Sequence, residues 1–254
     1  MLDIVMTATK RPEILRTTLE SFKKYMLDTV ECRLIINVDP VGVDYVTQME
    51  VVAIAGGYFP NLLYKCSEVA SFPKAFKWVF LRSESDYVLY LEDDWELLRI
   101  VDFVDIVMKL NENPKLALLR LAAFHASEST MKNWNKFFPY DAAKGYFVCP
   151  DELKLGVGFC GHPSVIKKEF IDKTVPYLAS RANPEKQFHR GGPKEVTTEV
   201  MKWEFGVYSK PNNPPLIRDI GRRWMVENNF RKAGSKAFFT NWCRVDEEKA
   251  NACI

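Results

Sequence analysis

Short apolar runs rich in β-branched and aromatic residues alternate with segments of helical periodicity through the first half of this chain. We expect strands at residues 2–7, 33–38, 62–65, 87–91 and 116–121. The segment after the first strand repeats apolar residues at helical spacing, namely Leu15, Leu19, Phe22 and Met26. Strands separated by helices of this length build a mostly parallel sheet with helices on both faces. The chain is therefore expected to adopt an α/β, Rossmann-like fold.

The other helices are expected at residues 45–55, 74–82, 101–110, 164–170 and 195–205. Gly56-Gly57 should end the first of these helices, and Gly206 should end the last. No internal repeat, low-complexity tract or linker interrupts the sequence. We therefore expect one domain over residues 1–254.

The composition is that of an ordinary globular protein, with 47% hydrophobic residues, 27% charged residues and a net charge of +2. So small a charge does not demand a nucleic-acid partner, although a local cluster of cations would permit one. The opening residues form no secretory leader, and no apolar run reaches the roughly 20 residues of a transmembrane helix. The six cysteines are scattered, which is typical of reduced thiols, so we expect a cytoplasmic protein.

The strand expected at residues 87–91 ends in three consecutive carboxylates, Glu92, Asp93 and Asp94. Neighbouring acids repel one another and are costly to remove from water, so packing gives no reason to place them after a buried strand. A divalent cation such as Mg²⁺ or Mn²⁺ removes that cost, because it prefers carboxylate oxygens and also binds phosphates. The triplet indicates a metal–phosphate site, and a solvated acidic turn is the alternative.

Two other expected strands also end in polar residues. The first runs into Thr7-Ala-Thr-Lys-Arg-Pro12, where Lys10 and Arg11 stand at the start of a helix and favour an anion such as a diphosphate. Asp39 ends the second strand, where it can accept hydrogen bonds from ribose hydroxyls. A capped helix start and an Asp-Pro turn are the ordinary alternatives. Ligands bind beyond the carboxyl ends of strands in such sheets, so one crevice could collect all three groups.

In these features the chain resembles the GT-A class of nucleotide-sugar glycosyltransferases, particularly its family-2-like members. The resemblance rests on the opening segment 4–12 with its helix, the strand that ends at Asp39, the segment Ser71-Phe-Pro-Lys-Ala75 and the acidic strand. In that class an acidic motif, D-x-D or its E-D-D variant, ends a central strand. It holds the Mn²⁺ or Mg²⁺ that bridges the donor diphosphate, so the resemblance implies a UDP-sugar donor and a divalent metal.

The resemblance also implies roles for particular residues. Glu92 and Asp94 would bind the metal, with Asp94 as the direct ligand, and Asp93 would face the ribose or the sugar. The nucleotide would contact Thr7, Thr9, Arg11, Asp39 and Lys74. Residues 1–125 would form the half that binds nucleotide-sugar and metal. Residues 126–254 would form the acceptor-binding half with a C-terminal closing segment.

A second cluster, Asp219-Ile-Gly-Arg-Arg-Trp224, lies late in the chain. Similar enzymes place a histidine there, often in a His-x-Gly setting, as another metal ligand. Asp219 occupies that place here and would be the third ligand. Arg222 and Arg223 would neutralise the leaving diphosphate, and Trp224 would cover it. The alternative is a surface turn with a basic pair.

Transfer with inversion needs a base near the acceptor hydroxyl. Inverting relatives place that carboxylate at a helix start after a glycine-containing loop, a position that Gly191-Gly-Pro-Lys-Glu195 fits. Glu195 would be the base, and Glu199, one helical turn later, is the second choice. Either residue could instead be a solvated helix acid, and a retaining enzyme would need neither.

Cations and aromatic residues mix in the second half of the chain and could grip a phosphate backbone and stack on a displaced base. They are Lys132, Trp134, Lys136, Phe137, Phe138, Arg181, His189, Arg190, Arg231, Lys232 and Lys236. Ordinary surface charge and core aromatics are the alternative. Small GT-A enzymes of phages glycosylate hydroxymethylated bases. By analogy we expect double-stranded phage DNA as the acceptor and the host cytoplasm as the location.

The expected function is metal-dependent transfer of a hexose, with glucose as the first expectation, from a UDP-sugar to a hydroxyl of a larger acceptor. A glycan or protein acceptor is one alternative. Other hypotheses are a sugar-phosphate nucleotidyltransferase, a metal nuclease that uses Glu92–Asp94, and a non-catalytic nucleic-acid-binding module.

Overall fold

A computed structural model describes residues 1–124, 138–232 and 242–245. Its centre is a nine-stranded sheet of order β3-β2-β1-β4-β10-β6-β11-β9-β8. Four parallel neighbours form one side, β3 (Leu62–Cys66), β2 (Cys32–Gly42), β1 (Leu2–Lys10) and β4 (Tyr87–Glu92). The other side is mixed and consists of β10 (Ser164–Lys167), β6 (Leu116–Leu121), β11 (Glu204–Tyr208), β9 (Tyr146–Val148) and β8 (Tyr140–Asp141).

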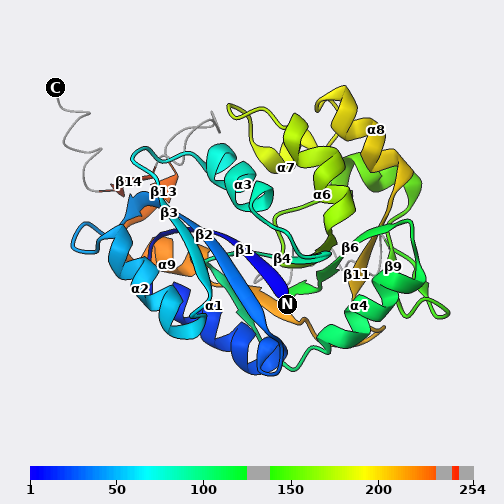
Figure 1. Ribbon diagram of the computed structural model, residues 1–254, viewed down its shortest axis with the longest axis horizontal. Coiled ribbons are helices and arrows are strands. Elements are labelled where there is room, and N and C mark those ends of the chain that lie inside the picture. Colours follow the sequence, from blue (N-terminus) through cyan, green and yellow to red (C-terminus); the bar gives the residue numbers. More distant parts are fainter. Residues whose placement is uncertain (125–137, 233–241, 246–254) are drawn as a thin grey trace.

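Helices cover both faces of this sheet (Figure 1), so the expected α/β architecture is confirmed. Successive residues of a strand point to opposite faces, and Ile4 and Met6 of β1 join one apolar cluster while Val5 joins the other. The first cluster includes side chains of α1 (Pro12–Phe22), α2 (Gln48–Tyr58) and α4 (Phe103–Glu112). The second includes side chains of α3 (Phe72–Leu81), α6 (Lys168–Thr174), α7 (Pro184–Gln187) with its C-cap residue, and α8 (Lys194–Lys202).

The helix α2 shows how local and tertiary signals combine. Thr47 and Glu50 form a capping box, in which each side chain accepts a hydrogen bond from the other residue's backbone N–H. The buried side chains of Val51, Val52 and Ala55 stabilise the helix, which continues through Gly56 and Gly57 to Tyr58. The prediction that the two glycines end this helix is therefore wrong. A glycine in a helix costs only about 1 kcal/mol, which capping and burial offset.

Gly42 bends the end of β2 onto the end of β1. Its φ of +123° lies in the left-handed region, and a Cβ at this position would lie 2.4 Å from the carbonyl oxygen of Lys10. That carbonyl instead accepts a hydrogen bond from the N–H of Val43 at 3.0 Å. Only glycine allows the two strand ends to approach so closely.

Two segments of the second half differ from their predicted structure. Residues 164–167 form the antiparallel strand β10 between β4 and β6, and the helix α6 begins only at Lys168. The helix α8 ends at Lys202, and Gly206 lies inside the following strand β11. A Cβ at Gly206 would lie 2.6 Å from Leu119 Cδ2 and 2.8 Å from Tyr146 Cδ2, so glycine is required by packing there rather than by a helix end. The β-branched and aromatic residues of both segments suit a strand, and burial between neighbouring strands favours that conformation.

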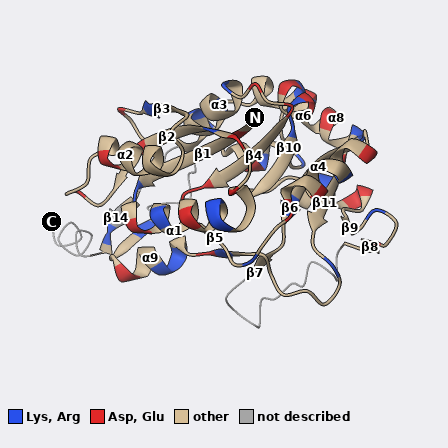
Figure 2. Ribbon diagram, turned by 60° about the horizontal axis from the view of Figure 1, so that its bottom comes forward, with Lys and Arg blue, Asp and Glu red and all other residues tan. Residues whose placement is uncertain are grey.

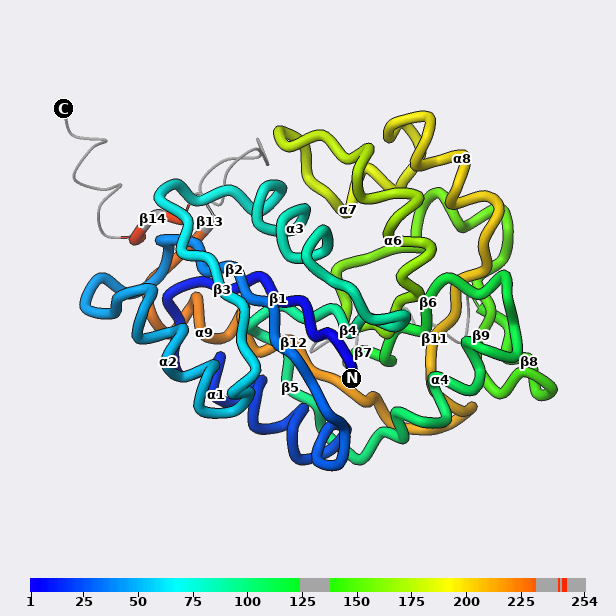
Figure 3. The backbone as a smooth tube through the Cα atoms, viewed as in Figure 1, coloured from blue at the N-terminus to red at the C-terminus, as the bar shows by residue number. Residues whose placement is uncertain are grey.

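The last part of the described chain returns to the end of β4, as the tube in Figure 3 shows. There β12 (Ile217–Asp219) pairs with β5 (Trp95–Leu97) and with β7 (Ala123–Phe124). The helix α9 (Gly221–Glu227) follows, and then β13 (Phe230–Lys232) pairs with β14 (Trp242–Arg244). The remaining helical turns are η1 (Lys23–Leu27), η3 (Asp151–Leu153), η4 (Lys154–Gly158) and η5 (Val175–Tyr177).

Within residues 1–124, 138–232 and 242–245, no helix combines the length and apolar character needed to cross a membrane. The side chains of Cys32, Cys66, Cys149 and Cys160 are free thiols.

Candidate active site

Polar side chains gather where β1, β2 and β4 end at one edge of the sheet. The register pairs Thr7 of β1 with Asn37 of β2 and with Glu92 of β4. Because these strands are parallel, the segments that follow them leave the sheet at the same edge. The expected convergence of the first, second and acidic strands is therefore present in the structure.

Asp93 is the most buried acid of the triplet, with 2% of its surface exposed. One carboxylate oxygen accepts hydrogen bonds from the N–H and the hydroxyl of Thr9, at 2.9 and 3.0 Å. The other accepts from Arg11 Nη2 at 2.5 Å, and the Asp93 carbonyl accepts from the Thr18 hydroxyl at 2.9 Å. Asp93 thus joins the acidic turn to the start of α1, and its expected contact with a ribose or sugar stays a prediction.

Asp94 is more accessible, with 20% of its side chain exposed. Its Oδ2 accepts a hydrogen bond from Arg11 Nη2 at 3.1 Å, and its carbonyl accepts from the N–H of Ile220 at 2.9 Å. The carboxylate also occupies the space that a Cβ at Gly221 would need, because that Cβ would lie 2.2 Å from Oδ2. The late segment of the chain therefore packs directly on Asp94, and its expected role as a closing segment stays a prediction.

Arg11 is enclosed by acids on one side and by aromatic rings on the other. Its guanidinium carbon lies 4.8 Å from the ring centre of Trp242 and 5.6 Å from that of Trp224. Burial alone would lower the pKa of this guanidinium, but the charges of Asp93 and Asp94 outweigh burial and raise the pKa above its usual value. The expected nucleotide contact of Arg11 stays a prediction.

The segment from Asp219 to Trp224 lies beside Asp94, since Asp219 of β12 pairs with Trp95. Oδ1 of Asp219 accepts hydrogen bonds from the N–H of Gly221 at 2.9 Å and of Arg222 at 3.4 Å, and its Oδ2 lies 3.3 Å from Arg222 Nε. The side chains of Arg222 and Arg223 are 90% and 84% exposed. These are the two cations of α9, part of whose ribbon is blue in Figure 2. Asp219 thus caps the start of α9.

Trp224 is buried and faces inward. Its ring stacks on Phe230 with centroids 5.4 Å apart, and it lies against Arg11 rather than over an open surface. In this structure Trp224 therefore secures α9 and β13 to the acidic cluster. Its expected position over a diphosphate stays a prediction.

Glu92 ends β4 in a half-buried position and accepts a hydrogen bond from the Tyr90 hydroxyl at 2.8 Å. That hydroxyl also interacts with the side chain of Thr7. Burial and then the charge of Asp94 raise the pKa of Glu92 to about 8. A Cβ at Gly161 would lie 2.9 Å from Glu92 Oε1, so this glycine leaves room for the carboxylate.

The donor set fits a hard divalent cation. Glu92 and Asp94 supply carboxylate oxygens, and both carboxylates lie in spaces kept open by glycine. In the part of the chain that the structure describes, no three His, Cys, Asp or Glu side chains converge in a metal-binding arrangement. Mg²⁺ is often bound by only one or two protein carboxylates and completes its shell with water and substrate phosphates. Asp219 would have to release its capping bonds to join such a shell.

Asp39 is 3% exposed and is bonded to its neighbours. The expectation that it ends the second strand is wrong, because β2 continues past Asp39 and Pro40 to Gly42, with an irregular register against β1. Its Oδ2 accepts from the N–H of Ser71 at 2.9 Å and its Oδ1 from Asn37 Nδ2 at 3.1 Å. Ser71 is the N-cap residue of α3, on whose exposed surface Lys74 lies. Asp39 therefore joins α3 to the edge of the sheet, and contacts of Asp39 and Lys74 with a nucleotide stay predictions.

The two predicted bases lie on α8, at the far end of the molecule from α9 in Figures 1 and 2. Glu195 is exposed in the first turn of this helix. Glu199 forms an ion pair with Lys202, with Glu199 Oε1 2.6 Å from Lys202 Nζ, and this bond lowers the pKa of Glu199. The structure gives neither residue a contact with Glu92 or Asp94.

A carboxylate that we did not single out in the sequence lies nearer to the acidic strand. Glu185 is half-buried in α7, after the N-cap residue Asn183 and Pro184. It is close enough for its charge to contribute to the raised pKa values of Tyr90 and Glu92. The motif Asn183-Pro184-Glu185 is a helix-start signal, so the sequence could have predicted α7. The sequence could not have predicted that α7 lies near β4.

Ring stacking and hydrogen bonds hold the segment around Glu185 in place. Phe188 stacks on Phe159 with centroids 4.0 Å apart. Gln187 exchanges hydrogen bonds with the backbone of Ala179, donating to its carbonyl and accepting from its N–H. His189 Nε2 lies 3.0 Å from the Phe159 carbonyl oxygen. Glu185 is thus presented from an anchored turn.

The cations and aromatics expected at an acceptor surface do not form one group. Phe138 is fully buried in the second apolar cluster, so the expectation that it stacks on an acceptor base is wrong for this conformation. Arg181, His189 and Arg190 flank α7, whereas Arg231 and Lys232 belong to β13. Lys132, Trp134, Lys136, Phe137 and Lys236 lie outside the described residues.

Beside Glu92 the chain carries a buried cation and a thiol that the sequence did not reveal. Arg120 of β6 is 1% exposed and donates from Nη1 to Cys160 Sγ at 2.9 Å. Burial alone would raise the pKa of this thiol, but the charge of Arg120 and the neighbouring His162 lower it to about 6. The His162 ring packs 5.0 Å from that of Trp95. Cys160, Gly161 and His162 therefore form one wall of the site.

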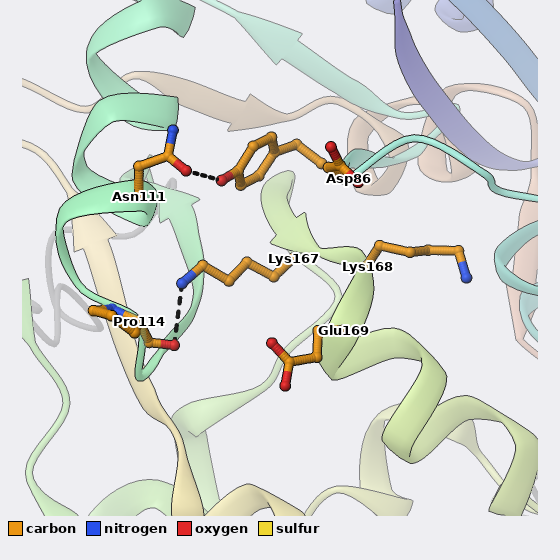
Figure 4. A pocket seen from close by; sticks show the side chains of 7 residues that line it. Asp86, Asn111, Pro114, Lys167, Lys168 and Glu169 are labelled. Atoms are coloured by element: carbon orange, nitrogen blue, oxygen red, sulfur yellow. Dashed lines mark hydrogen bonds between the residues drawn. The ribbon is translucent and has the colours of Figure 1, made fainter.

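A cavity of about 330 Å³ lies at the opposite edge of the sheet, by the start of β4 (Figure 4). Several of its polar groups already have partners. Lys167 Nζ donates to the carbonyls of Asn113 and Pro114, and the Tyr87 hydroxyl donates to Asn111. The six residues of β4 separate this cavity from the acids by roughly 20 Å at the usual rise of a strand. We therefore locate the candidate site at the acidic edge.

Comparison with known proteins finds the same fold elsewhere. No protein-family model and no curated protein sequence matches the chain. Among solved structures, S. aureus TarS has a TM-score of 0.58 at 10% identity, covering 86% of this chain and 36% of TarS. The TarS fragment 1–349 in complex with UDP-GlcNAc has a TM-score of 0.58 at 10% identity, covering 85% and 57%.

A further match is the mannosyltransferase PcManGT from Pyrobaculum calidifontis in complex with GDP-Man and Mn²⁺. Its TM-score is 0.57 at 9% identity, with 89% of this chain and 59% of that chain covered. The chain spans less than two thirds of the length of each of these proteins. At such low identity the likeness establishes the fold alone. The chain has the GT-A fold of nucleotide-sugar glycosyltransferases.

Proposed function

We propose that this protein is a metal-dependent glycosyltransferase that takes a hexose from a UDP-sugar and transfers it to a hydroxyl of a larger acceptor. The observation that carries the proposal is the meeting of Thr9, Asp39, Glu92 and Asp94 at one edge of a GT-A sheet. Structural neighbours bind nucleotide sugars, UDP-GlcNAc in one and GDP-Man with Mn²⁺ in another, which supports this class of substrate.

The acidic edge would hold the donor diphosphate through a Mn²⁺ or Mg²⁺ ion. Asp94 would be the direct ligand because it is the more accessible acid, and Glu92 would assist once it has lost its proton. The bound ion would supply Lewis-acid stabilisation of the negative charge that develops on the leaving diphosphate. Arg222 and Arg223 are exposed on α9 and would add positive charge from the outside. Asp219 remains the proposed third ligand.

Residues at the ends of β1 and β2 would recognise the nucleotide. The proposed contacts come from Thr7, Thr9, Arg11, Asp39, Lys74 and Asp93, with Trp224 covering the site. Asp93 and Asp39 are already engaged with neighbouring residues, and these bonds hold the strand ends in register. Such residues favour binding by pre-organising the pocket, because little side-chain entropy is then lost when the donor arrives.

Glu185 is our first choice for the base that takes the proton of the acceptor hydroxyl. It is half-buried on an anchored turn, and its charge acts on Glu92 and Tyr90. Glu195 and Glu199 remain candidates, but they lie on α8, where Glu199 is already paired with Lys202. A base must come within hydrogen-bond reach of the acceptor hydroxyl, which favours the carboxylate nearest to the donor site.

The acceptor side is proposed from charge alone. Arg181 and Arg190 are exposed on either side of α7, close in sequence to Glu185. Exposed arginines suit an anionic acceptor, and hydroxymethylated double-stranded DNA is the first one to test. Glucose is the first donor sugar to test. A glycan or a protein hydroxyl is the alternative acceptor.

The test is donor hydrolysis and thermal stabilisation with UDP- and GDP-sugars, each with and without Mn²⁺. We expect UDP to raise the melting temperature only when Mn²⁺ is present. Asp94→Asn should abolish this rise and lower hydrolysis by about 100-fold, a typical loss when a key charge-stabilising group is removed. Asp28→Asn, at an exposed acid outside the site, is the matched control and should behave like the parent.

Three results would contradict the proposal. If UDP stabilised the protein equally with and without Mn²⁺, the proposed metal site would be wrong. If Asp94→Asn hydrolysed the donor as fast as the parent, the proposed role of Asp94 would be wrong. Cleavage of DNA without any nucleotide would instead favour the metal nuclease.

A further inference from the structure

A single nitrogen of Arg11 bridges two carboxylates of the acidic motif. Nη2 lies 2.5 Å from Asp93 Oδ1 and 3.1 Å from Asp94 Oδ2. Nε of the same side chain donates to the Thr9 hydroxyl at 2.7 Å. Asp93 needs this cation because it is fully buried. Asp94 is partly exposed and would be stable without it, so the second contact calls for a functional explanation.

Arg11 cannot easily leave this position. Only 4% of its side chain is exposed, and the guanidinium carbon lies 4.8 Å from the ring centre of Trp242 and 5.6 Å from that of Trp224. Trp224 is in turn stacked on Phe230. A planar cation enclosed by acids and aromatic rings loses both contacts if it moves, so its charge is a permanent part of the site.

Asp94 is also held in place, although by fewer bonds than Asp93. Its carbonyl is bound by the N–H of Ile220, and its Oδ2 lies between Arg11 and the backbone of Gly221. Any second cation bound by this carboxylate must therefore share it with the guanidinium. A double and a single positive charge about 5 Å apart repel strongly enough, even in water, to change a binding constant roughly tenfold.

We propose that Arg11 is a built-in counter-ion that keeps the affinity of Asp94 for a divalent cation low until a nucleoside diphosphate is present. The diphosphate brings negative charge and further oxygen ligands, which offset the repulsion from Arg11. Metal and donor then bind together rather than one after the other. This inference rests on the proposed function, because it assumes that Asp94 is a metal ligand.

Mn²⁺ binding in the absence of any nucleotide tests the inference directly. The parent, Arg11→Gln, Arg11→Lys and Arg16→Gln would be titrated with Mn²⁺ by calorimetry and by the electron paramagnetic resonance signal of free Mn²⁺. Arg16 lies exposed on α1, so Arg16→Gln makes the same change in net charge away from the acids. We expect Arg11→Gln to bind Mn²⁺ about tenfold more tightly than Arg16→Gln, as estimated from the charges.

Arg11→Lys covers the case in which Arg11→Gln does not fold. A lysine side chain keeps a positive charge near Asp93, but it is shorter and ends before the position of Nη2, the nitrogen that bridges both acids. We therefore expect a smaller gain in Mn²⁺ affinity, roughly threefold. In both variants UDP should increase Mn²⁺ affinity by a smaller factor than in the parent. Equal or weaker Mn²⁺ binding by the folded Arg11 variants, compared with Arg16→Gln, would overturn the inference.

The parent titration separates this inference from the proposed function. If the parent binds no Mn²⁺ even with saturating UDP, the proposed metal site itself is wrong. If the parent binds Mn²⁺ with UDP but the Arg11 variants gain no affinity without it, the metal site stands and only the role of Arg11 fails.

Discussion

Replacing Gly221 by alanine is the most direct test of the packing between the late segment and the acidic motif. The added Cβ would lie 2.2 Å from Asp94 Oδ2, 2.8 Å from its Cγ and 2.9 Å from its Cβ. Real Cβ atoms essentially never approach so closely, so the Asp94 side chain or the start of α9 must move. The backbone of Asp94 is bound to the N–H of Ile220, and β12 pairs with β5 on the same stretch. The carboxylate is therefore the group that gives way.

The expected size of the effect follows from the contact that is lost. Turning the Asp94 carboxylate breaks its 3.1 Å bond to Arg11, and a hydrogen bond between charged groups contributes about 1.5–3 kcal/mol. Alanine in place of glycine in a helix returns up to about 1 kcal/mol. The free energy of unfolding should thus fall by about 1–2 kcal/mol. If Asp94 binds the metal as proposed, displacing its carboxylate should weaken Mn²⁺–UDP binding by about 10- to 100-fold.

Urea unfolding and calorimetric titration of UDP with Mn²⁺ measure the two effects. Gly57→Ala is the matched control, because Gly57 lies in α2 with no atom within 4 Å of an added Cβ. That variant should gain about 0.5–1 kcal/mol of stability and bind UDP as the parent does. If Gly221→Ala had the same stability in urea and the same affinity for UDP with Mn²⁺ as Gly57→Ala, the contact between Asp94 and α9 would be refuted.

Two further predictions concern the carboxylates of the site. Glu92 has a pKa of about 8 in the folded chain against an ordinary value of 4.5, so the folded state holds an extra proton between these values. As the pH rises from about 4.5 to about 8, the metal-free parent should therefore lose stability relative to Glu92→Gln. If the urea midpoints of the two proteins changed with pH in the same way over that range, the raised pKa of Glu92 would be contradicted. Glu185→Gln should lower kcat by about 100-fold or more and leave Mn²⁺–UDP affinity unchanged, as expected for a general base. The steady-state comparison is Glu195→Gln, and a larger loss in that variant would assign the base to α8 instead.

Local sequence signals predicted most of the first half of the fold. The strands at β1, β2, β3, β4 and β6 and the helices between them follow from apolar periodicity and from turn residues, which act over a few positions. The second half was harder, because Ser164–Lys167 and Gly206 owe their conformations to neighbouring strands that are distant in sequence. A segment buried within a sheet takes its structure from its neighbours rather than from its own propensity.

The sequence by itself determined the chemistry available at the strand ends, since Thr9, Asp39 and Glu92–Asp94 each follow an apolar run and must emerge at one edge of a parallel sheet. Only the tertiary structure decided how that chemistry is shared. It placed Arg11 between Asp93 and Asp94, set Gly221 against Asp94, and brought Glu185 within electrostatic range of Glu92. Asp94 and Gly221, for example, are 127 positions apart in the sequence (221 − 94). No local pattern encodes these relations, because they arise when the chain closes over the sheet and buries its aromatic residues around a charged cluster.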